Sequence, residues 1–370
     1  MRLRVAFITG GLDLAGAEQQ LLYLTRGMDR NRFEPLVINI REHGALAPEF
    51  RASGVDLVEL GYHGKYDVGI IGRIRRVLVG RGVAIACPYL WPATIWGYAA
   101  LRLAGISRWI ASERNSDDLY DPRWQVDLES RVLRRAPALV AITNAAREFA
   151  VRRGVRPERV RVIRIGVAPP VVTRSRDAVR RELGLAPDAP VIACVARFGP
   201  QKDHATLVRA TRLVRDRVPG VRLVLVGDGP LRPAIEALAA ELGMRDAVVL
   251  TGIRSDAMEL LNACDVAALA SSRQEGCSNF LIESALLGKP IASTRVGGIP
   301  EAVQDAETGY LAPGGDAEAL ADALTRLLCD SDLAGRFGAA GKRRAEQEFS
   351  LQAMVSGWER LFDELPNVRG

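Results

Sequence analysis

The sequence predicts two α/β domains, each built around a parallel β-sheet. A chain of 370 residues is longer than one hydrophobic core usually supports, and so two domains are expected. Short apolar runs alternate with helical patterns along most of the chain, which is the order of elements in parallel sheets covered by helices. The clearest example is a strand–helix–strand unit that begins at Val266 and ends in the turn before Pro300.

The elements of this unit follow from its apolar residues and turn signals. Val266–Ala270 is an apolar run typical of a strand buried on both faces. The polar segment 271–279 predicts a loop at the carboxyl end of that strand. Apolar residues between 280 and 286 then recur at helical spacing, and Gly288–Lys289–Pro290 predicts the end of the helix. Ile291–Ala292 begins the second strand.

Two carboxylates, Glu275 and Glu283, flank the junction between this loop and this helix. In open parallel sheets, ligands bind beyond the carboxyl ends of the strands, where helix N-termini direct free N–H groups toward anions. An alternative is that Glu283 only complements the helix dipole, which is worth about 0.3–1 kcal/mol, and that Glu275 is a solvated loop residue. The surrounding residues favour a ligand site.

Residues 275–301, EGCSNFLIESALLGKPIASTRVGGIPE, resemble the donor-sugar site of retaining glycosyltransferases of family 4, which have the GT-B fold. The E-x7-E pair and the G-G-x-x-E turn after it are the most specific marks of that family. The resemblance implies two Rossmann-like domains with parallel sheets that face each other across a cleft. It implies an acceptor-binding domain of residues 1–168, completed by a C-terminal crossover helix at 350–367, and a nucleotide-sugar-binding domain of residues 169–349.

A second motif follows the predicted strand Val191–Val195. Arg197 and Lys202 flank a Gly-Pro turn at the start of a helix, and two cations together with helix N–H groups suit a diphosphate. Exposed loop cations with no ligand are the ordinary alternative. The segment resembles the G-R-L-x-x-x-K-G phosphate clamp of the family, with Ala196 in place of Gly and Phe198 in place of Leu. The resemblance therefore makes Arg197 and Lys202 the ligands of the donor diphosphate.

The resemblance also implies the other donor contacts. The run G-A-E-x-Q-L near the N-terminus resembles the first glycine loop of the family, although a plain strand–turn–helix connection would have the same pattern. Base recognition is expected after the predicted strand Val248–Gly252, largely through backbone groups. The predicted catalytic residues are Glu275, Arg197 and Lys202. The predicted donor-binding residues are Gly11, Gly16, Arg197, Lys202, Gly252, Ile253, Glu275, Gly276, Cys277, Ser278, Asn279 and Glu283.

Acceptor contacts are expected in the first half of the chain. The family often carries a histidine at the end of its fourth strand, where this sequence has Tyr89, so a role borrowed from that histidine does not transfer. The polar loop after the predicted strand Trp109–Ser112 supplies Arg114, Asn115 and Asp117 as further acceptor candidates, although polar loops are common.

The resemblance implies transfer of a sugar from a nucleoside-diphosphate donor, with a UDP-sugar expected first, to a hydroxyl on a glycan or lipid-linked acceptor in cell-surface polysaccharide, lipopolysaccharide or glycolipid synthesis. The sequence Asp330–Ser331–Asp332 matches the metal-binding D-x-D of another glycosyltransferase fold. It lies between two predicted helices, where Asp and Ser act as caps, and so we expect neither a metal ion nor a cofactor. Two alternatives are an epimerase-like GT-B enzyme, disfavoured by the placement of the three histidines, and a non-catalytic nucleotide-sugar-binding protein.

Charge is unevenly distributed along the chain. Through Ala168 there are 26 Lys and Arg against 17 Asp and Glu, whereas the remainder has 24 against 27. The basic half indicates either solvated helix faces or an anionic partner such as a membrane surface, a lipid diphosphate or nucleic acid. No nucleic-acid-binding motif is present, and we expect no such partner.

The sequence predicts a cytoplasmic protein that binds the inner membrane surface peripherally at most. Its five cysteines are scattered and form no C-x-x-C pair, and no apolar run is long enough to span a membrane.

Overall fold

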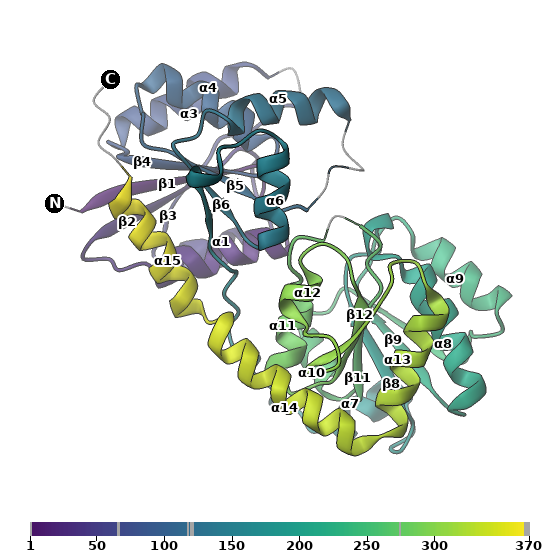
Figure 1. Ribbon diagram of the computed structural model, residues 1–370. Coiled ribbons are helices and arrows are strands. Elements are labelled where there is room, and N and C mark those ends of the chain that lie inside the picture. The colour runs from purple at the N-terminus through teal and green to yellow at the C-terminus, as the bar shows by residue number, and fades with distance from the viewer. Residues whose placement is uncertain (1, 65–66, 117, 119–121, 274, 366–370) are drawn as a thin grey trace. The chain divides into compact units, whose positions relative to one another are not determined.

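The computed structural model describes residues 2–64, 67–116, 118, 122–273 and 275–365, and it divides into two compact units (Figure 1). Unit 1 comprises Met1–Val167 with Ser350–Gly370, and unit 2 comprises Ala168–Phe349. The division falls one residue before the expected boundary. Residues 366 and 367 of the expected crossover helix lie outside the described residues.

Most strands of unit 1 are buried apolar runs, and the described strands pair in parallel. They form a sheet of order β3-β2-β1-β4 and a second of order β5-β6-β7, which a bridge between Ala86 and Trp109 connects. Their bounds are β1 (Leu3–Thr9), β2 (Phe33–Asn39), β3 (Asp56–Glu59), β4 (Ile85–Tyr89), β5 (Ile110–Glu113), β6 (Ala138–Ala141) and β7 (Val160–Val162).

The apolar run Val83–Ala86 predicts a strand, whereas β4 spans Ile85–Tyr89 and continues through Pro88. The N–H of Ala86 donates to Arg108, on the side of β4 away from β1. Strand alternation puts the missing N–H of Pro88 on that same side, so the pairing of Pro88 with Ile8 of β1 loses no hydrogen bond. As a consequence, Tyr89 is the last residue of a buried strand.

The helices of unit 1 bury one apolar face each against these sheets. Helix α15 places Trp358 and Phe362 edge-on to Phe7 of β1, at centroid distances of 6.2 and 6.4 Å, so the C-terminal segment completes the core of unit 1. The helices are α1 (Gly16–Gly27), α2 (Ala47–Ala52), α3 (Gly69–Gly80), α4 (Ala93–Ala104), α5 (Arg123–Leu133), α6 (Asn144–Arg152) and α15 (Leu351–Glu364).

Unit 2 is a single six-stranded parallel sheet of order β10-β9-β8-β11-β12-β13. The strands are β8 (Val191–Val195), β9 (Arg222–Val226), β10 (Val248–Gly252), β11 (Val266–Leu269), β12 (Ile291–Thr294) and β13 (Gly309–Ala312). The chain runs outward from β8 in one direction and from β11 in the other. The sheet therefore has its topological switch point between β8 and β11, where ligands bind in open α/β sheets.

The helices of unit 2 connect these strands. They are α7 (Arg176–Glu182), α8 (His204–Arg217), α9 (Arg232–Glu241), α10 (Ala257–Asn262), α11 (Asn279–Leu286), α12 (Ile299–Ala302), α13 (Ala317–Cys329) and α14 (Ser331–Glu348). The Asp330 side chain accepts a hydrogen bond from the N–H of Leu333 at 2.8 Å, which confirms that it is a helix cap. Among the described residues, no group of three His, Cys, Asp or Glu side chains is arranged to hold a metal ion.

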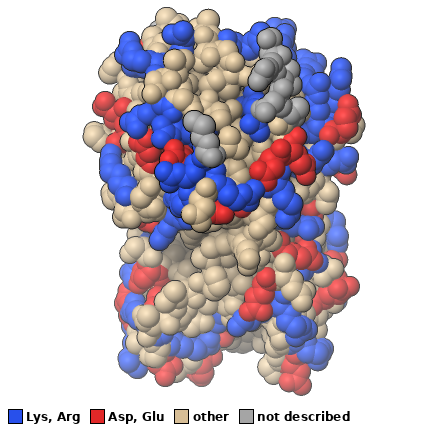
Figure 2. Space-filling view, turned by 90° about the vertical axis from the view of Figure 1, so that its left-hand side faces the viewer, with Lys and Arg blue, Asp and Glu red and all other residues tan. Residues whose placement is uncertain are grey.

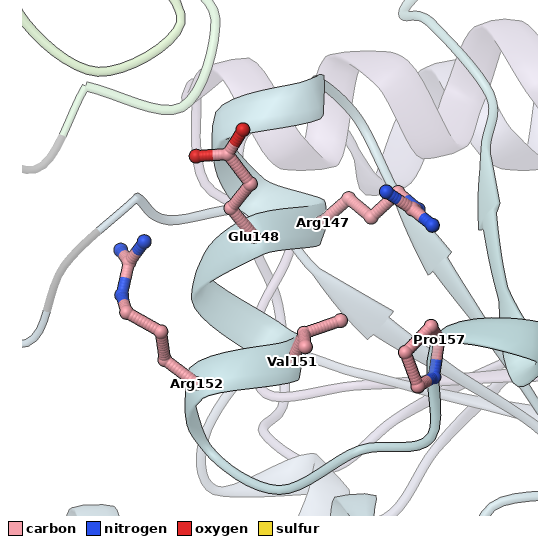
Figure 3. A pocket seen from close by; sticks show the side chains of 5 residues that line it. All are labelled: Arg147, Glu148, Val151, Arg152 and Pro157. Carbon is pink, nitrogen blue, oxygen red and sulfur yellow. The ribbon is translucent and has the colours of Figure 1, made fainter.

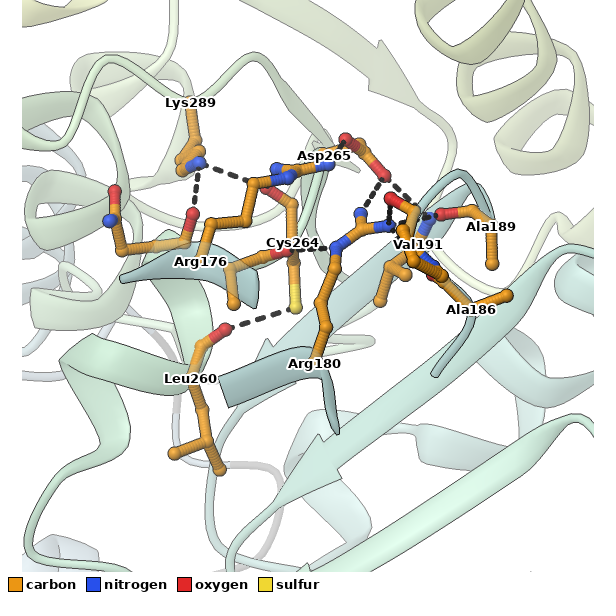
Figure 4. A network of polar contacts seen from close by, with 12 residues as sticks. Arg176, Arg180, Ala186, Ala189, Val191, Leu260, Cys264, Asp265 and Lys289 are labelled. Atoms are coloured by element: carbon orange, nitrogen blue, oxygen red, sulfur yellow. Dashed lines mark hydrogen bonds and ion pairs between the residues drawn. The ribbon is translucent and has the colours of Figure 1, made fainter. Parts of the chain in front are cut away.

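A polar network fixes the amino ends of the two strands at the switch point (Figure 4). Asp265, just before β11, accepts from the N–H of Val191 of β8 at 2.8 Å and from Arg180 Nη2 at 2.9 Å. Arg180 is 1% exposed and also donates to the carbonyl of Ala263. Because these groups satisfy one another, β8 and β11 are held in register from the edge opposite their carboxyl ends.

Candidate active site

The loops that leave β8 and β11 meet at the switch point of unit 2. The N–H of Ser272, in the loop after β11, donates to the carbonyl of Gln201, in the loop after β8, at 3.0 Å. The loop after β12 joins them, because the N–H of Gly298 donates to the carbonyl of Glu275 at 2.8 Å. The three loops that carry the predicted donor motifs are thus gathered at one edge of the sheet.

Lys202 and Glu275 form the centre of this site. Lys202 Nζ lies 2.6 Å from Glu275 Oε2, and the hydroxyl of Ser271 donates to the same oxygen at 2.7 Å. The Glu275 side chain is 5% exposed and that of Lys202 is 19% exposed. Two predicted catalytic residues that lie 73 positions apart in the sequence are therefore in contact. Ser271, which the sequence analysis did not identify, is the third member.

Arg197 stands on a loop that is fixed by its neighbours. The ladder between β8 and β9 continues beyond both strands, because the N–H of Phe198 donates to the carbonyl of Asp228 at 2.9 Å. A Cβ on Gly227, whose φ is +138°, would lie 2.1 Å from the carbonyl oxygen of Ala196, so only glycine fits there. Phe198 is fully buried, whereas the Arg197 side chain is exposed and has no ion pair or hydrogen bond with a described residue. The loop thus presents one guanidinium to solvent on a rigid base.

Asp203, which stands where the family clamp has glycine, adopts a left-handed backbone conformation. Its φ of +44° and ψ of +52° lie in the left-handed region that glycine and, less easily, Asp can adopt. The carboxylate accepts from the N–H of Thr206 at 3.1 Å and so caps α8. The cap compensates for the cost of the conformation, and Lys202 is held directly before the first turn of α8.

The N-terminus of α11 carries the rest of the predicted donor set. Gly276 and Ser278 are buried, whereas Cys277 and Asn279 are half-buried. Glu283 lies in the middle of α11 and is also half-buried, and no hydrogen bond joins its carboxylate to a described residue. Burial raises the pKa of Glu283 to about 7. A carboxyl group in such surroundings is suited to accept hydrogen bonds from the hydroxyl groups of a ligand.

Gly252 and Ile253, where base recognition is expected, follow β10. The carbonyl of Gly252 accepts from the N–H of Gly227 at 2.9 Å, which ties this loop to the turn beside Arg197. Ile253 is 75% exposed, an unusual state for a large apolar side chain.

The predicted contacts in unit 1 lie after β1, β4 and β5. Gly11 is buried just beyond β1, and Gly16 is the exposed first residue of α1. Tyr89 is 1% exposed, and Arg114 donates from Nη2 to its hydroxyl. The N–H of Asn115 donates to Glu113 at 3.1 Å. Asp117 lies outside the described residues.

A surface pocket of about 300 Å³ on α6 is separate from these residues (Figure 3). It is lined by Arg147, Glu148, Val151, Arg152 and Pro157, none of which belongs to the predicted site. We therefore assign it no part in the reaction.

Some basic side chains of unit 1 form ion pairs with described acidic residues, and others do not. Arg73 pairs with Asp67, and Arg153 with Glu113, whereas Arg75 and Arg76 on α3 are exposed and form no ion pair with a described residue. On the face in Figure 2, acidic side chains are interspersed among the basic ones. No helix within the described ranges is long and apolar enough to cross a membrane.

Comparison with protein families identifies both halves of the chain. Residues 15–166 match the glycosyl transferase 4-like domain, and residues 175–344 match the glycosyl transferases group 1. Together the two matches span most of both units. The chain therefore belongs to the group 1, family 4 glycosyltransferases, as the sequence motifs predicted.

Relatives with assigned names support this membership. The chain is 34% identical over 187 residues to the lipopolysaccharide core biosynthesis glycosyltransferase LpsE of Rhizobium meliloti, an alignment that covers 50% of this chain and 54% of LpsE. It is 33% identical over 266 residues to D-inositol 3-phosphate glycosyltransferase of Saccharomonospora viridis, covering 68% of this chain and 60% of that protein. The chain thus spans little more than half the length of these relatives.

Solved structures show the same fold over nearly the whole chain. Anabaena Alr3699/HepE in complex with UDP-glucose has a TM-score of 0.88 at 20% identity and covers 98% of this chain and 100% of that chain. Sucrose-phosphate synthase from Thermosynechococcus elongatus has a TM-score of 0.82 at 22% identity, with 98% and 99% covered. The fold is of the GT-B type that the sequence predicted.

Proposed function

We propose that this chain transfers a sugar from a nucleoside-diphosphate sugar to a hydroxyl acceptor, with retention of the anomeric configuration and without a metal ion. The observation that carries the proposal is the contact of Lys202 with Glu275 at the switch point of unit 2, beside the exposed Arg197. Family membership supports the class of reaction. The UDP-glucose bound in the Anabaena relative supports a UDP-sugar as the first donor to test, and the GDP-mannose-dependent mannosyltransferase of Mycobacterium tuberculosis supports GDP-mannose as the second.

The donor diphosphate would bind between Arg197 and Lys202. The guanidinium offers a fork of donors and the ammonium a point charge, so the two can neutralise a diphosphate in place of a metal ion. In this structure Lys202 Nζ is 2.6 Å from Glu275 Oε2. A bound diphosphate would draw Lys202 toward itself, and one oxygen of Glu275 would then accept a hydroxyl of the donor sugar.

Transfer would proceed by exchange of one bond at the anomeric carbon. The bond from that carbon to the diphosphate oxygen breaks, and its electron pair leaves on the diphosphate, where Arg197 and Lys202 stabilise the charge. Glu275 would stabilise the positive charge that develops on the sugar. The acceptor oxygen bonds to the same face of the anomeric carbon, and its proton passes to the departing diphosphate oxygen.

The remaining donor contacts would hold the nucleoside. Glu283, half-buried and without a hydrogen bond to a described residue, would accept the ribose hydroxyls, as carboxylates do in other nucleotide sites. Ile253 offers its 75% exposed side chain to the base, and the backbone of Gly252 lies beside it. Gly11 and Gly16 of unit 1 are also proposed as donor-binding residues.

The acceptor is proposed to be a glycan or a lipid-linked sugar that contacts Tyr89, Arg114 and Asn115.

A location at the inner membrane surface is supported by α3 and α4, which expose Arg76, Val79 at 54% and Leu103 at 62%. Arg75 of α3 donates to the carbonyl of Leu103 on α4 at 2.9 Å, so these side chains share one face. Cations among exposed apolar side chains suit an anionic lipid surface.

Sedimentation with lipid vesicles tests the membrane part of the proposal. The chain should sediment with vesicles that contain phosphatidylglycerol and not with phosphatidylcholine vesicles, and added salt should release it. Leu103→Ser should weaken sedimentation, whereas the same change at Leu14, 67% exposed and outside this face, should not. Equal sedimentation of both variants would contradict the assignment of this face.

The reaction itself is tested by incubating the chain with UDP-glucose or GDP-mannose and octyl glycosides. Products separated by chromatography should carry one additional sugar, and proton NMR should give the α configuration of the donor. Activity should persist in EDTA. A β-linked product would refute retention, loss of activity in EDTA would refute metal independence, and binding of donor without turnover would favour a non-catalytic protein.

A further inference from the structure

A buried ionic network closes the carboxyl end of β5 in unit 1. Glu113 is the last residue of β5, and its Oε2 lies 2.9 Å from Nη1 of Arg153, the residue after α6. Nη2 of Arg153 lies 2.8 Å from Oε2 of Glu129 on α5. The side chains of Glu113 and Arg153 are only 6% and 8% exposed. Three elements of unit 1 therefore converge on one guanidinium.

The same network holds the loop that follows β5. Glu113 Oε1 accepts from the backbone N–H of Arg114 at 3.0 Å and from that of Asn115 at 3.1 Å. Arg152, the last residue of α6, donates to the carbonyl of Ser116 at 3.3 Å. Three consecutive loop residues are thus bound by charged side chains that are rooted in β5 and α6.

The loop directs the side chain of Arg114 back toward β4. Its Cζ atom lies 4.4 Å from the centre of the Tyr89 ring, and Nη2 donates to the Tyr89 hydroxyl. Arg114 forms no ion pair with any residue that the structure describes, and its buried Nε has no hydrogen-bond partner there. The network therefore holds the half-buried guanidinium of Arg114, which has a hydrogen-bond donor that no described residue uses, at the carboxyl edge of β4 and β5.

Stability alone does not explain this network. Two carboxylates share one guanidinium, and burial raises the pKa of Glu113 to about 7 against the opposing effect of Arg153. Buried ion pairs are often no more stabilising than apolar side chains of the same volume, because the charges must leave water. The charged side chains at this position are explained instead by the need to hold the loop after β5 in a defined geometry.

We propose that Glu113, held by Arg153, is a positioning residue for acceptor binding, because it fixes the loop that places Arg114 against Tyr89. The inference rests on the proposed transferase function, since Tyr89 and Arg114 are its acceptor contacts. It adds a residue that does not itself touch the acceptor.

Kinetics of single and double variants test this role. Glu113→Gln keeps an oxygen for the loop N–H groups but puts an amide opposite Arg153, and Arg114→Gln removes the positioned group. With octyl glucoside as the acceptor, each single variant should raise the acceptor KM about tenfold, and the double variant no more than Arg114→Gln alone. The KM for UDP-glucose should stay unchanged. Glu34→Gln, which removes a carboxylate paired with Arg4 at the start of β2, is the matched control.

Hydrogen exchange on the full chain supplies a readout that needs no acceptor. The amides of Arg114 and Asn115 should exchange about tenfold faster in Glu113→Gln, because they lose a charged hydrogen-bond acceptor, while amides of β1 stay protected. Arg153→Lys, which keeps the charge but loses the fork to Glu113 and Glu129, is the substitute if Glu113→Gln does not fold.

The outcomes distinguish the positioning role of Glu113 from the proposed transferase function. Unchanged exchange at residues 114–115 would overturn the positioning role, and so would additive losses in the double variant or an equal rise of both KM values. A wild-type chain without any transfer would instead overturn the proposed function and the acceptor role of this loop with it. Faster exchange together with a non-additive loss in acceptor KM supports the inference.

Discussion

Glu283→Gln gives a quantitative test of the donor site, because the half-buried carboxyl group of Glu283 has no hydrogen-bond partner among the described residues. Burial raises its pKa from the ordinary value of 4.5 to about 7. Between these two pH values the folded chain holds a proton that the unfolded chain has lost, and so the free energy of unfolding should fall as the pH rises through this window. The difference of about 2.5 between the pKa values corresponds to about 3 kcal/mol as an upper bound, since the side chain keeps some exposure.

Glutamine removes the ionisation and keeps the size of the side chain. The variant should therefore unfold with a free energy close to that of the wild type at pH 4.5 and become the more stable of the two by up to about 3 kcal/mol at pH 8. Urea unfolding at a series of pH values measures the difference. Glu307→Gln, at an exposed loop position, is the matched control.

The same substitution should weaken donor binding, because an amide is a poorer acceptor for the two ribose hydroxyls than a carboxylate. A loss of about tenfold in UDP affinity is expected for a charged hydrogen bond. A variant whose stability follows the wild-type pH curve, or one that gains stability and binds UDP equally well, would refute the reasoning about Glu283.

Three other substitutions test neighbouring parts of the account. Lys202→Gln should lower kcat/KM for the donor about a hundredfold or more, and unchanged kinetics would remove Lys202 from the mechanism. Gly227→Ala should destabilise unit 2 by at least about 1–3 kcal/mol in urea unfolding, because the new Cβ would lie 2.1 Å from the carbonyl oxygen of Ala196. Gly199→Ala, in the neighbouring loop after β8, has nothing within 4 Å of the new Cβ and should leave the stability unchanged. Trp358→Ala should cost about 3–5 kcal/mol, and a cost below 1 kcal/mol would contradict the packing of α15 on β1.

The sequence was sufficient to predict most elements of the sheets. Strands such as Val191–Val195 and Val248–Gly252 agree with the prediction to the residue, because both begin with a continuous run of apolar, mostly β-branched residues. The end of β4 was placed too early. Pro88 fits within β4 because its missing N–H faces away from β1, and only the pairing of the strand shows this.

The sequence identified residues of the candidate site but not the contacts between them. The spacing of Glu275 and Glu283, and of Arg197 and Lys202, identified the donor motifs, since local spacing is preserved within a loop and its helix. The pairing of Lys202 with Glu275 depends on β8 and β11 being neighbours, and strand order is not encoded in any local pattern. For this reason Ser271 also escaped detection.

In unit 1, too, the sequence did not reveal the contacts of a buried residue. Glu113 was counted with the polar loop after the predicted strand Trp109–Ser112, whereas the structure makes it the last, buried residue of β5. A charged residue at the end of a short strand is ordinarily solvated, and nothing in the sequence brings Arg153 to it from 40 positions away.

Titration calorimetry of UDP and UDP-glucose into the full chain measures whether the switch point of unit 2 binds a nucleoside diphosphate through Arg197. The wild type should bind both ligands, and Arg197→Gln should weaken both about tenfold or more, because it loses a charge-assisted fork. Arg209→Gln, at an exposed position on α8, should bind as the wild type does. Absence of binding to the wild type, or equal binding by the Arg197 variant, would contradict the account.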